Sequence, residues 1–156
     1  MMKTSDEGLE LIKQFEGLRL EPYRCSAGVL TIGYGHTHNV KHTDIITKIK
    51  AEQYLREDVA HAEDVVNSSV RVELNQHQYD ALIDFVFNLG GRNFKKSTLL
   101  KKINNRKSND EICIEFRKWD KCSITKIING QRVVVKESLP GLTKRRDAEV
   151  HLWLKH

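Results

Sequence analysis

A change of hydrophobic period near the start of this 156-residue chain constrains its fold more than any other feature. Between residues 17 and 37, short extended pieces at 23–25 and 29–32 are separated by Ser26-Ala27-Gly28 and closed by Gly33-Tyr34-Gly35, a pattern typical of a small antiparallel hairpin or three-stranded sheet. Elsewhere apolar residues recur at helical spacing. About twenty residues cannot fold alone, so the sheet must be a lobe of a larger helical protein. The sequence therefore predicts an α+β fold.

The longest predicted helix runs from about Thr47 to Asn67, where apolar residues keep helical spacing over about five turns. Because it follows the sheet directly, we expect it to connect the sheet to the rest of the chain. Upstream, Thr4 and Glu7 form a capping box, which predicts a helix to about Glu16. Glu16 falls on the edge of the apolar stripe of that helix, which is unusual for a purely solvent-facing glutamate.

Further helices are expected downstream. Asn75 and Gln78 form a second capping arrangement, and the helix that follows must end at Gly90-Gly91. The other edge of this helix carries Asp80, Asp84 and Asn88. Shorter helices are expected at about 97–104, 109–119 and 143–154, and an Asn129-Gly130 turn between β-branched runs at 127–133 predicts a hairpin.

The length and composition predict one domain spanning residues 1–156. We expect a small β lobe over about residues 17–45. A helical lobe would comprise about residues 68–156 together with the N-terminal helix, and the long helix would join the two lobes. Internal repeats and low-complexity linkers are absent from the sequence.

The absence of an apolar span, the first residues and the cysteines together indicate the cellular compartment. No run approaches the roughly 18 consecutive apolar residues of a membrane span, and the first residues do not resemble a signal peptide, so a cytoplasmic protein without stable membrane insertion is expected. Cys25, Cys113 and Cys122 are odd in number and lack Cys-x-x-Cys spacing, which favours reduced thiols. The sequence does not decide whether Cys113 and Cys122 pair in an oxidising space.

The net charge of +5 and the pI near 9.1 favour an anionic partner. A basic nucleic-acid-binding module is one interpretation of this charge. The other is an ordinary solvated surface, on which such patches are common. The densest patches lie at Lys95-Lys96, Lys101-Lys102 through Arg106-Lys107, and Lys144-Arg145-Arg146.

Residues 15–37 are the richest in chemically capable side chains. Glu16 lies near a helix C-terminus, where the helix dipole and partial burial both favour the protonated carboxyl group. A protonated carboxyl group at neutral pH is what a general acid requires. The alternative is that Glu16 is an ordinary surface acid or the salt-bridge partner of an arginine.

The same segment contains residues for two alternative sites, a cysteine–histidine dyad and a histidine metal site. Cys25 with His36 could form the nucleophile and base of a cysteine hydrolase, although a single thiol in a strand is more often a small buried hydrophobe. His36, His38 and His42 could contribute to a metal site, but no carboxylate or cysteine completes it at convincing spacing. We therefore predict no metal site and no cofactor.

The segment from Glu16-Gly17-Leu18-Arg19-Leu20 through Tyr23-Arg24-Cys25 to Gly28-Val29-Leu30-Thr31-Ile32-Gly33-Tyr34-Gly35-His36-Thr37 resembles the phage lysozymes (endolysins) of glycoside hydrolase family 24. The family signature is Glu, eight residues, Asp or Cys, five residues, Thr. Glu16, Cys25 and Thr31 fit this spacing without a gap. The resemblance continues at Ala81-Leu82, Phe85-Val86-Phe87-Asn88-Leu89-Gly90, Ser97-Thr98-Leu99-Leu100, Gly141-Leu142 and Arg145-Arg146, so it spans nearly the whole chain.

The resemblance implies a lysozyme-like catalytic domain that hydrolyses the β-1,4 bond between N-acetylmuramic acid and N-acetylglucosamine in bacterial peptidoglycan. It implies that Glu16 is the acid and that Cys25 and Thr31 activate and hold the attacking water, which gives inversion. It further implies that Arg145 or Arg146 orients Glu16, and that His36 and Asn88 contribute to substrate binding or orientation. Many members carry aspartate in place of Cys25, so a base, a covalent nucleophile giving retention and a water-orienting group all stay open for this thiol.

The resemblance also implies partners. Because the chain begins directly in a capped helix, it implies a cytoplasmic enzyme that depends on a separate holin to open the inner membrane, and that leads to host lysis and phage release. A lytic phage and a prophage are equally compatible with the sequence. A monomer that binds peptidoglycan and no nucleic acid is the simplest expectation. The alternatives remain a cysteine hydrolase that uses Cys25 and His36, or a basic nucleic-acid-binding module.

Overall fold

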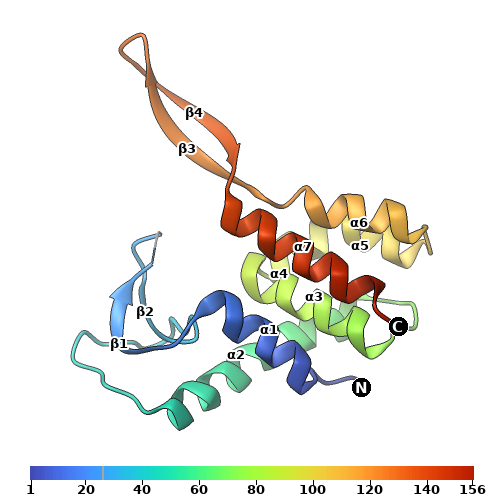
Figure 1. Cartoon of the computed structure of the whole chain (residues 1–156), viewed down its shortest axis with the longest axis horizontal. Helices are drawn as coiled ribbons and strands as arrows, with labels where there is room; N and C mark the ends of the chain where they lie inside the picture. Colours follow the sequence, from blue (N-terminus) through green and yellow to red (C-terminus); the bar gives the residue numbers. More distant parts are fainter. Residues whose placement is uncertain (26) are drawn as a thin grey trace.

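The computed structural model describes residues 1–25 and 27–156, so Ser26 of the predicted separator between the strands lies outside the described residues. Within them the chain forms seven α-helices and two separate two-stranded antiparallel sheets (Figure 1). In chain order the elements are α1 (Asp6–Glu16), β1 (Arg19–Arg24), β2 (Leu30–Gly33), α2 (Lys48–Ser69), α3 (Gln76–Leu89), α4 (Gly91–Lys96), α5 (Thr98–Asn104), α6 (Asn109–Arg117), β3 (Lys121–Ile128), β4 (Gln131–Ser138) and α7 (Pro140–Leu154). The predicted α+β class is confirmed.

The first sheet is the predicted hairpin, and it has two strands. Tyr23 of β1 pairs with Thr31 of β2 in antiparallel register, and the pairing is irregular between Arg19 and Tyr23. The alternative of a three-stranded sheet does not occur, and an isolated bridge between Ile32 and His36 follows β2 instead. The tight Gly33-Tyr34-Gly35 turn, in which both glycines have a positive φ, brings His36 back onto Ile32.

Helix α2 connects the β1–β2 hairpin to the helices, as the sequence predicted (Figure 1). The Thr47 hydroxyl caps it by accepting the Lys50 backbone N–H at 3.1 Å. The helix packs on β2 at one end and on α3 and α4 further along. None of the helices among residues 1–25 and 27–156 is both long enough and apolar enough to cross a membrane.

The predicted capping box at the start of α1 is wrong by one residue. Ser5, not Thr4, is the N-cap, and its hydroxyl accepts the Gly8 N–H at 3.2 Å. The Ser5 hydroxyl is also hydrogen-bonded to the buried Asp80 carboxylate of α3. The Thr4 N–H instead donates to Glu63 of α2 at 2.9 Å, so tertiary contacts select the cap. The predicted helix end at Glu16 is confirmed.

Helix α3 lies at the centre of the helical part and packs against α1, α2, α4 and α7. Its predicted capping box between Asn75 and Gln78 is present. Phe85 is fully buried, and the rings of Phe94, Phe116 and Trp119 meet it edge-on at centroid distances of 6.0, 5.7 and 5.7 Å. This aromatic cluster joins α3 to α4 and α6, and the Phe116 ring also lies 5.7 Å from the Trp153 ring of α7, measured between centroids.

The second sheet is a long hairpin between α6 and α7. Asn129 and Gly130 form its turn with φ values of 52° and 77°, as expected for an Asn-Gly turn of a two-residue hairpin. The strands are longer than the predicted segment at 127–133, since they pair from Lys121 with Ser138 to Ile128 with Gln131. The hairpin extends away from the helices (Figure 1).

Candidate active site

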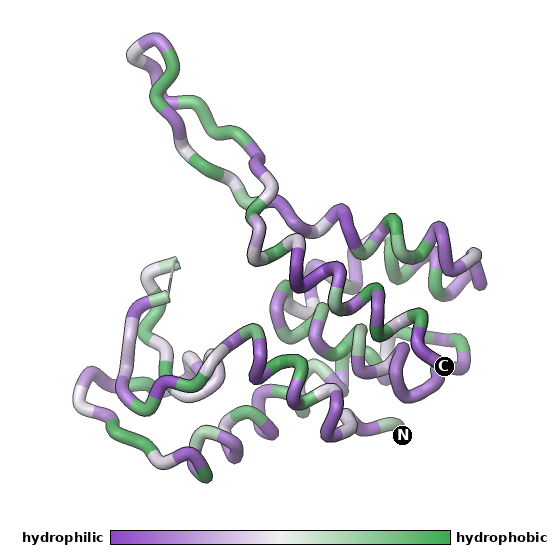
Figure 2. Tube along the Cα trace, in the orientation of Figure 1, coloured by the Kyte–Doolittle hydropathy of each residue, from purple (hydrophilic) through white to green (hydrophobic). Residues whose placement is uncertain are grey.

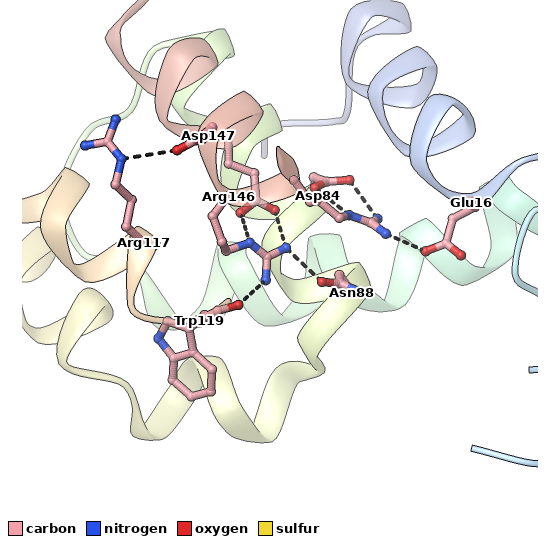
Figure 3. Close-up of polar contacts among 9 residues, drawn as sticks. Glu16, Asp84, Asn88, Arg117, Trp119, Arg146 and Asp147 are labelled. Atoms are coloured by element: carbon pink, nitrogen blue, oxygen red, sulfur yellow. Dashed lines mark hydrogen bonds and ion pairs between the residues drawn. The ribbon is translucent and has the colours of Figure 1, made fainter. Parts of the chain in front are cut away.

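Glu16 is the last residue of α1, and its side chain meets the last helix of the chain. Arg145 of α7 donates from Nη1 to Glu16 Oε1 at 2.8 Å (Figure 3). The Glu16 side chain keeps 21% of its surface exposed, whereas that of Arg145 keeps 6%. Gly17 follows with a positive φ of 69°, which ends the helix and turns the chain into β1. Glu16 therefore combines a fixed position with access to solvent.

Arg145 is shared between two carboxylates. It donates from Nε and Nη2 to Asp84 of α3 at 3.0 and 2.9 Å, a bidentate pair in which Asp84 is fully buried. Burial acts to lower the pKa of Arg145, but Asp84 and Glu16 outweigh it and the pKa is raised. The Asp84 carboxylate alone thus compensates the positive charge of the Arg145 guanidinium group. Arg145 therefore stays charged while it holds the Glu16 carboxyl group.

The sequence left open which arginine contacts Glu16, and the structure selects Arg145. The interpretation of the Lys144-Arg145-Arg146 patch as an ordinary solvated surface is wrong for Arg146, which is fully buried. Arg146 lies 2.7 Å from Glu149 Oε1 and donates to Asn88 Oδ1 at 2.8 Å and to the Trp119 carbonyl oxygen at 3.3 Å (Figure 3). Arg146 and Asn88 therefore tie α7 to α3 and to the start of the second hairpin.

Glu149 completes the buried charged cluster. Burial raises its pKa well above the usual range, and the neighbouring Asp84 carboxyl group adds to this effect, while Arg146 opposes it. Glu149 is fully buried. The cluster as a whole places three carboxyl groups, those of Glu16, Asp84 and Glu149, around two guanidinium groups.

Cys25 and Thr31 lie near the turn that connects β1 to β2, where the Cys25 backbone N–H donates to the Val29 carbonyl oxygen at 3.0 Å. Hydrogen bonds from the backbone of Val29 and Ala27 lower the pKa of the half-buried Cys25 thiol, and the Thr31 side chain adds to this. The buried Thr31 hydroxyl also donates to the Val29 carbonyl oxygen at 2.9 Å. The structure therefore brings together the two residues that the sequence selected from this hairpin.

Both Glu16 and Cys25 affect the pKa of Tyr23. Burial raises the pKa of the Tyr23 phenol, and the negative charges of Glu16 and Cys25 contribute further. Tyr23 lies in β1, paired with Thr31. Glu16 and Cys25 therefore both lie close enough to Tyr23 to affect the pKa of its phenol.

Gly35 is a site residue that sequence reasoning missed. It has a positive φ of 78°, and a Cβ atom at this position would lie 2.7 Å from Glu16 Oε2. The turn after β2 therefore lies directly against the Glu16 carboxylate. Its glycine is needed both for the backbone conformation and for the close approach.

His36 has partners on α2. Its Nδ1 lies 2.8 Å from Asp58 Oδ2, and its ring stacks on Tyr54 at a centroid distance of 4.1 Å. Burial raises the pKa of Asp58, and the hydrogen bond to His36 opposes that shift. His36 therefore joins the small lobe to α2. A cysteine hydrolase built on Cys25 and His36 is not supported.

A pocket of about 350 Å³ begins at Gly35 and lies between the small lobe and the helices. It is lined by residues of the turn after β2, of α2 and of the end of α3, including Gly35, Thr37, Asp58, His61, Phe87 and Gly90. Among residues 1–25 and 27–156, no group of three or more His, Cys, Asp or Glu side chains is placed to hold a metal ion. Gly35 therefore lies both against the Glu16 carboxylate and in the lining of this pocket.

A small β hairpin joined by a long helix to a helical lobe, with a glutamate at the end of the first helix held by an arginine of the last, defines a lysozyme-type glycoside hydrolase. The sequence model of the phage lysozyme family matches residues 13–149, and the chain belongs to this family.

Relatives agree with this assignment. The chain is 47% identical over 152 residues to the endolysin of Acyrthosiphon pisum secondary endosymbiont phage 1, covering 97% of this chain and 98% of the relative. It is 43% identical over 109 residues to the endolysin of Salmonella phage P22, covering 67% and 75% of the two chains.

Solved structures show the same fold. The muramidase domain of SpmX from Asticaccaulis excentricus superposes with a TM-score of 0.88 at 34% identity, covering both chains completely. The endolysin from Escherichia coli O157:H7 phage FAHEc1 superposes with a TM-score of 0.84 at 35% identity, covering 98% of this chain and 94% of the other. The chain is a lysozyme-like muramidase.

Proposed function

We propose that this lysozyme cleaves the β-1,4 bond between N-acetylmuramic acid and N-acetylglucosamine in bacterial peptidoglycan, and that this cleavage lyses the host cell and releases phage. The observation that carries the proposal is the Glu16 carboxyl group, partly exposed beside the Gly35 turn and held by Arg145 at 2.8 Å. Membership of the phage lysozyme family supports the same substrate.

Glu16 acts as the general acid and protonates the leaving glycosidic oxygen. Cys25 and Thr31 hold and activate the attacking water, and the lowered pKa of the thiol supports this role. In that arrangement the anomeric configuration inverts. Attack by Cys25 itself would form a covalent glycosyl intermediate and retain the configuration, so the anomer of the first product distinguishes the two roles.

Arg145 and Asp84 act as positioning residues for the acid. Asp84 binds the guanidinium group through two hydrogen bonds and leaves Nη1 to Glu16. Arg146, Asn88 and His36 act on the substrate only indirectly in this account, because the contacts described for their side chains run to other parts of the protein.

The cellular part of the proposal concerns release. The lysozyme accumulates as a monomer in the host cytoplasm and reaches the cell wall after a separate holin has opened the inner membrane. Expression alone should then leave cells intact, whereas co-expression with a holin should lyse them. Lysis of equal speed without a holin would contradict this route.

Product analysis tests the cleaved bond. Purified peptidoglycan is digested, the new reducing ends are reduced with borohydride, and the products are identified by mass spectrometry. The proposal predicts muramitol at the new ends. Glucosaminitol ends, or released stem peptides with intact glycan strands, would contradict it.

A further inference from the structure

The β3–β4 hairpin lies outside the proposed catalytic arrangement. Each strand has eight residues and reaches about 26 Å. Every position in both strands is exposed or half-buried, and the hairpin projects from the helices (Figure 1). A two-stranded hairpin without further packing is marginally stable in water, so its length is not explained by the stability of the fold.

The end of the hairpin is apolar on both faces. Ile127 and Ile128 are consecutive in β3, so their side chains point to opposite faces, and they are 76% and 48% exposed. Val134 of β4 lies on the same face as Ile127 and is 69% exposed. Figure 2 shows hydrophobic stretches along both strands. One flat protein surface could cover one of these faces, but not both.

The charge of the hairpin is predominantly positive. It carries four cationic residues and one acidic residue, Glu137, which pairs with Lys126. Arg132 lies directly opposite Ile127 in the strand register. Cationic groups therefore flank the exposed isoleucines. The cationic residues are Lys121, Lys126, Arg132 and Lys136.

This combination fits the surface of an anionic bilayer. Lipid surrounds an inserted tip and covers both of its faces, while phosphate groups meet the cations at its sides. A glycan strand fits less well, because residues 121–138 contain no aromatic side chain on which a sugar ring could stack. The exposed aliphatic side chains favour a lipid partner over a purely anionic polymer.

We propose that the tip of the β3–β4 hairpin inserts shallowly into bilayers that contain anionic phospholipids. Ile127 and Ile128 enter the boundary between headgroups and acyl chains, and Arg132 contacts the phosphate groups. The binding is peripheral and weakens with salt, and it requires no membrane-spanning segment. It is also independent of glycan cleavage, so it can fail while the proposed function holds.

Co-sedimentation of the whole protein with vesicles tests the proposal. One set contains phosphatidylglycerol and phosphatidylethanolamine, and the other contains phosphatidylcholine alone. We expect partitioning onto the anionic vesicles and about tenfold weaker partitioning for the double variant Ile127→Ser, Ile128→Ser, which keeps every charge. Activity on purified peptidoglycan shows that the variant is folded.

The matched control is the double variant Ile45→Ser, Ile49→Ser, which removes two isoleucines that are 77% and 73% exposed outside the hairpin. It should partition like the wild type. No binding of the wild type to anionic vesicles would overturn the proposal, and so would equal partitioning of the two double variants. If the tip variant instead loses binding to peptidoglycan and keeps binding to vesicles, the hairpin contacts the wall and not the membrane.

Discussion

Replacing Gly35 by alanine perturbs both the backbone of the small lobe and the Glu16 carboxylate. Gly35 has a φ of 78°, where an L-residue costs about 1–2 kcal/mol. The new Cβ atom would also lie 2.7 Å from Glu16 Oε2, well inside an ordinary carbon–oxygen contact. The carboxylate, the turn or both must therefore move by several tenths of an ångström.

The two consequences can be separated by measurement. The backbone cost should lower the melting temperature by about 2–8 °C in a domain of this size. Displacement of the acid should lower kcat on purified peptidoglycan by about ten- to a hundredfold, since misplacement of a reacting group by about 1 Å costs about a hundredfold.

Gly28→Ala is the control, because Gly28 also has a φ of 78° but no atom of residues 1–25 or 27–156 lies within 4 Å of the added Cβ. It should lose similar stability and keep most of the activity. Wild-type kcat in Gly35→Ala, or equal losses of kcat in both variants, would refute the argument that this turn positions Glu16.

Three further predictions follow from buried or shifted groups. Asp84→Asn removes the carboxylate that holds the Arg145 guanidinium group through two hydrogen bonds, so Arg145 should hold Glu16 less precisely and kcat on purified peptidoglycan should fall about ten- to a hundredfold. Asp80→Asn, at another fully buried position of the same helix, should cost stability and leave kcat near the wild-type value. Cys25→Asp should retain muramidase activity and Cys25→Ala should lose most of it, whereas loss in both would indicate a nucleophilic thiol. Burial raises the pKa of Tyr79 from 10.0 to about 12. Between about pH 10 and pH 12 the folded state therefore keeps a phenol proton that the unfolded state releases, so the free energy of unfolding falls as pH rises through this range. Unfolding curves for Tyr79→Phe should show a smaller fall over the same range.

The helices and hairpins with strong local signals could be predicted from the sequence. The Asn75–Gln78 capping box and the Asn129-Gly130 turn occur as predicted, because these motifs satisfy backbone groups within a few residues. Helix α4 was not predicted. It has six residues and depends on burial of Phe94 against Phe85, a contact that periodicity over so short a segment does not indicate.

The site could be predicted only in part, because its remaining contacts join distant segments. The fixed spacing selected Glu16, Cys25 and Thr31, and their catalytic roles stay predictions. The sequence placed Asp84 on a polar edge of its helix, because three polar residues at i, i+4 and i+8 form one stripe along a helix. It could not predict the contact of Asp84 with Arg145, which joins residues 61 positions apart.

Kinetics of Glu16→Gln and Glu10→Gln on purified peptidoglycan test the central claim most directly. Both substitutions remove a carboxylate from α1, but the Glu10 carboxylate is exposed and pairs with Lys13 on the surface. If Glu16 is the general acid, kcat falls by about a hundred- to ten-thousandfold in Glu16→Gln and stays near the wild-type value in Glu10→Gln. Wild-type kcat in a folded Glu16→Gln variant would contradict the account.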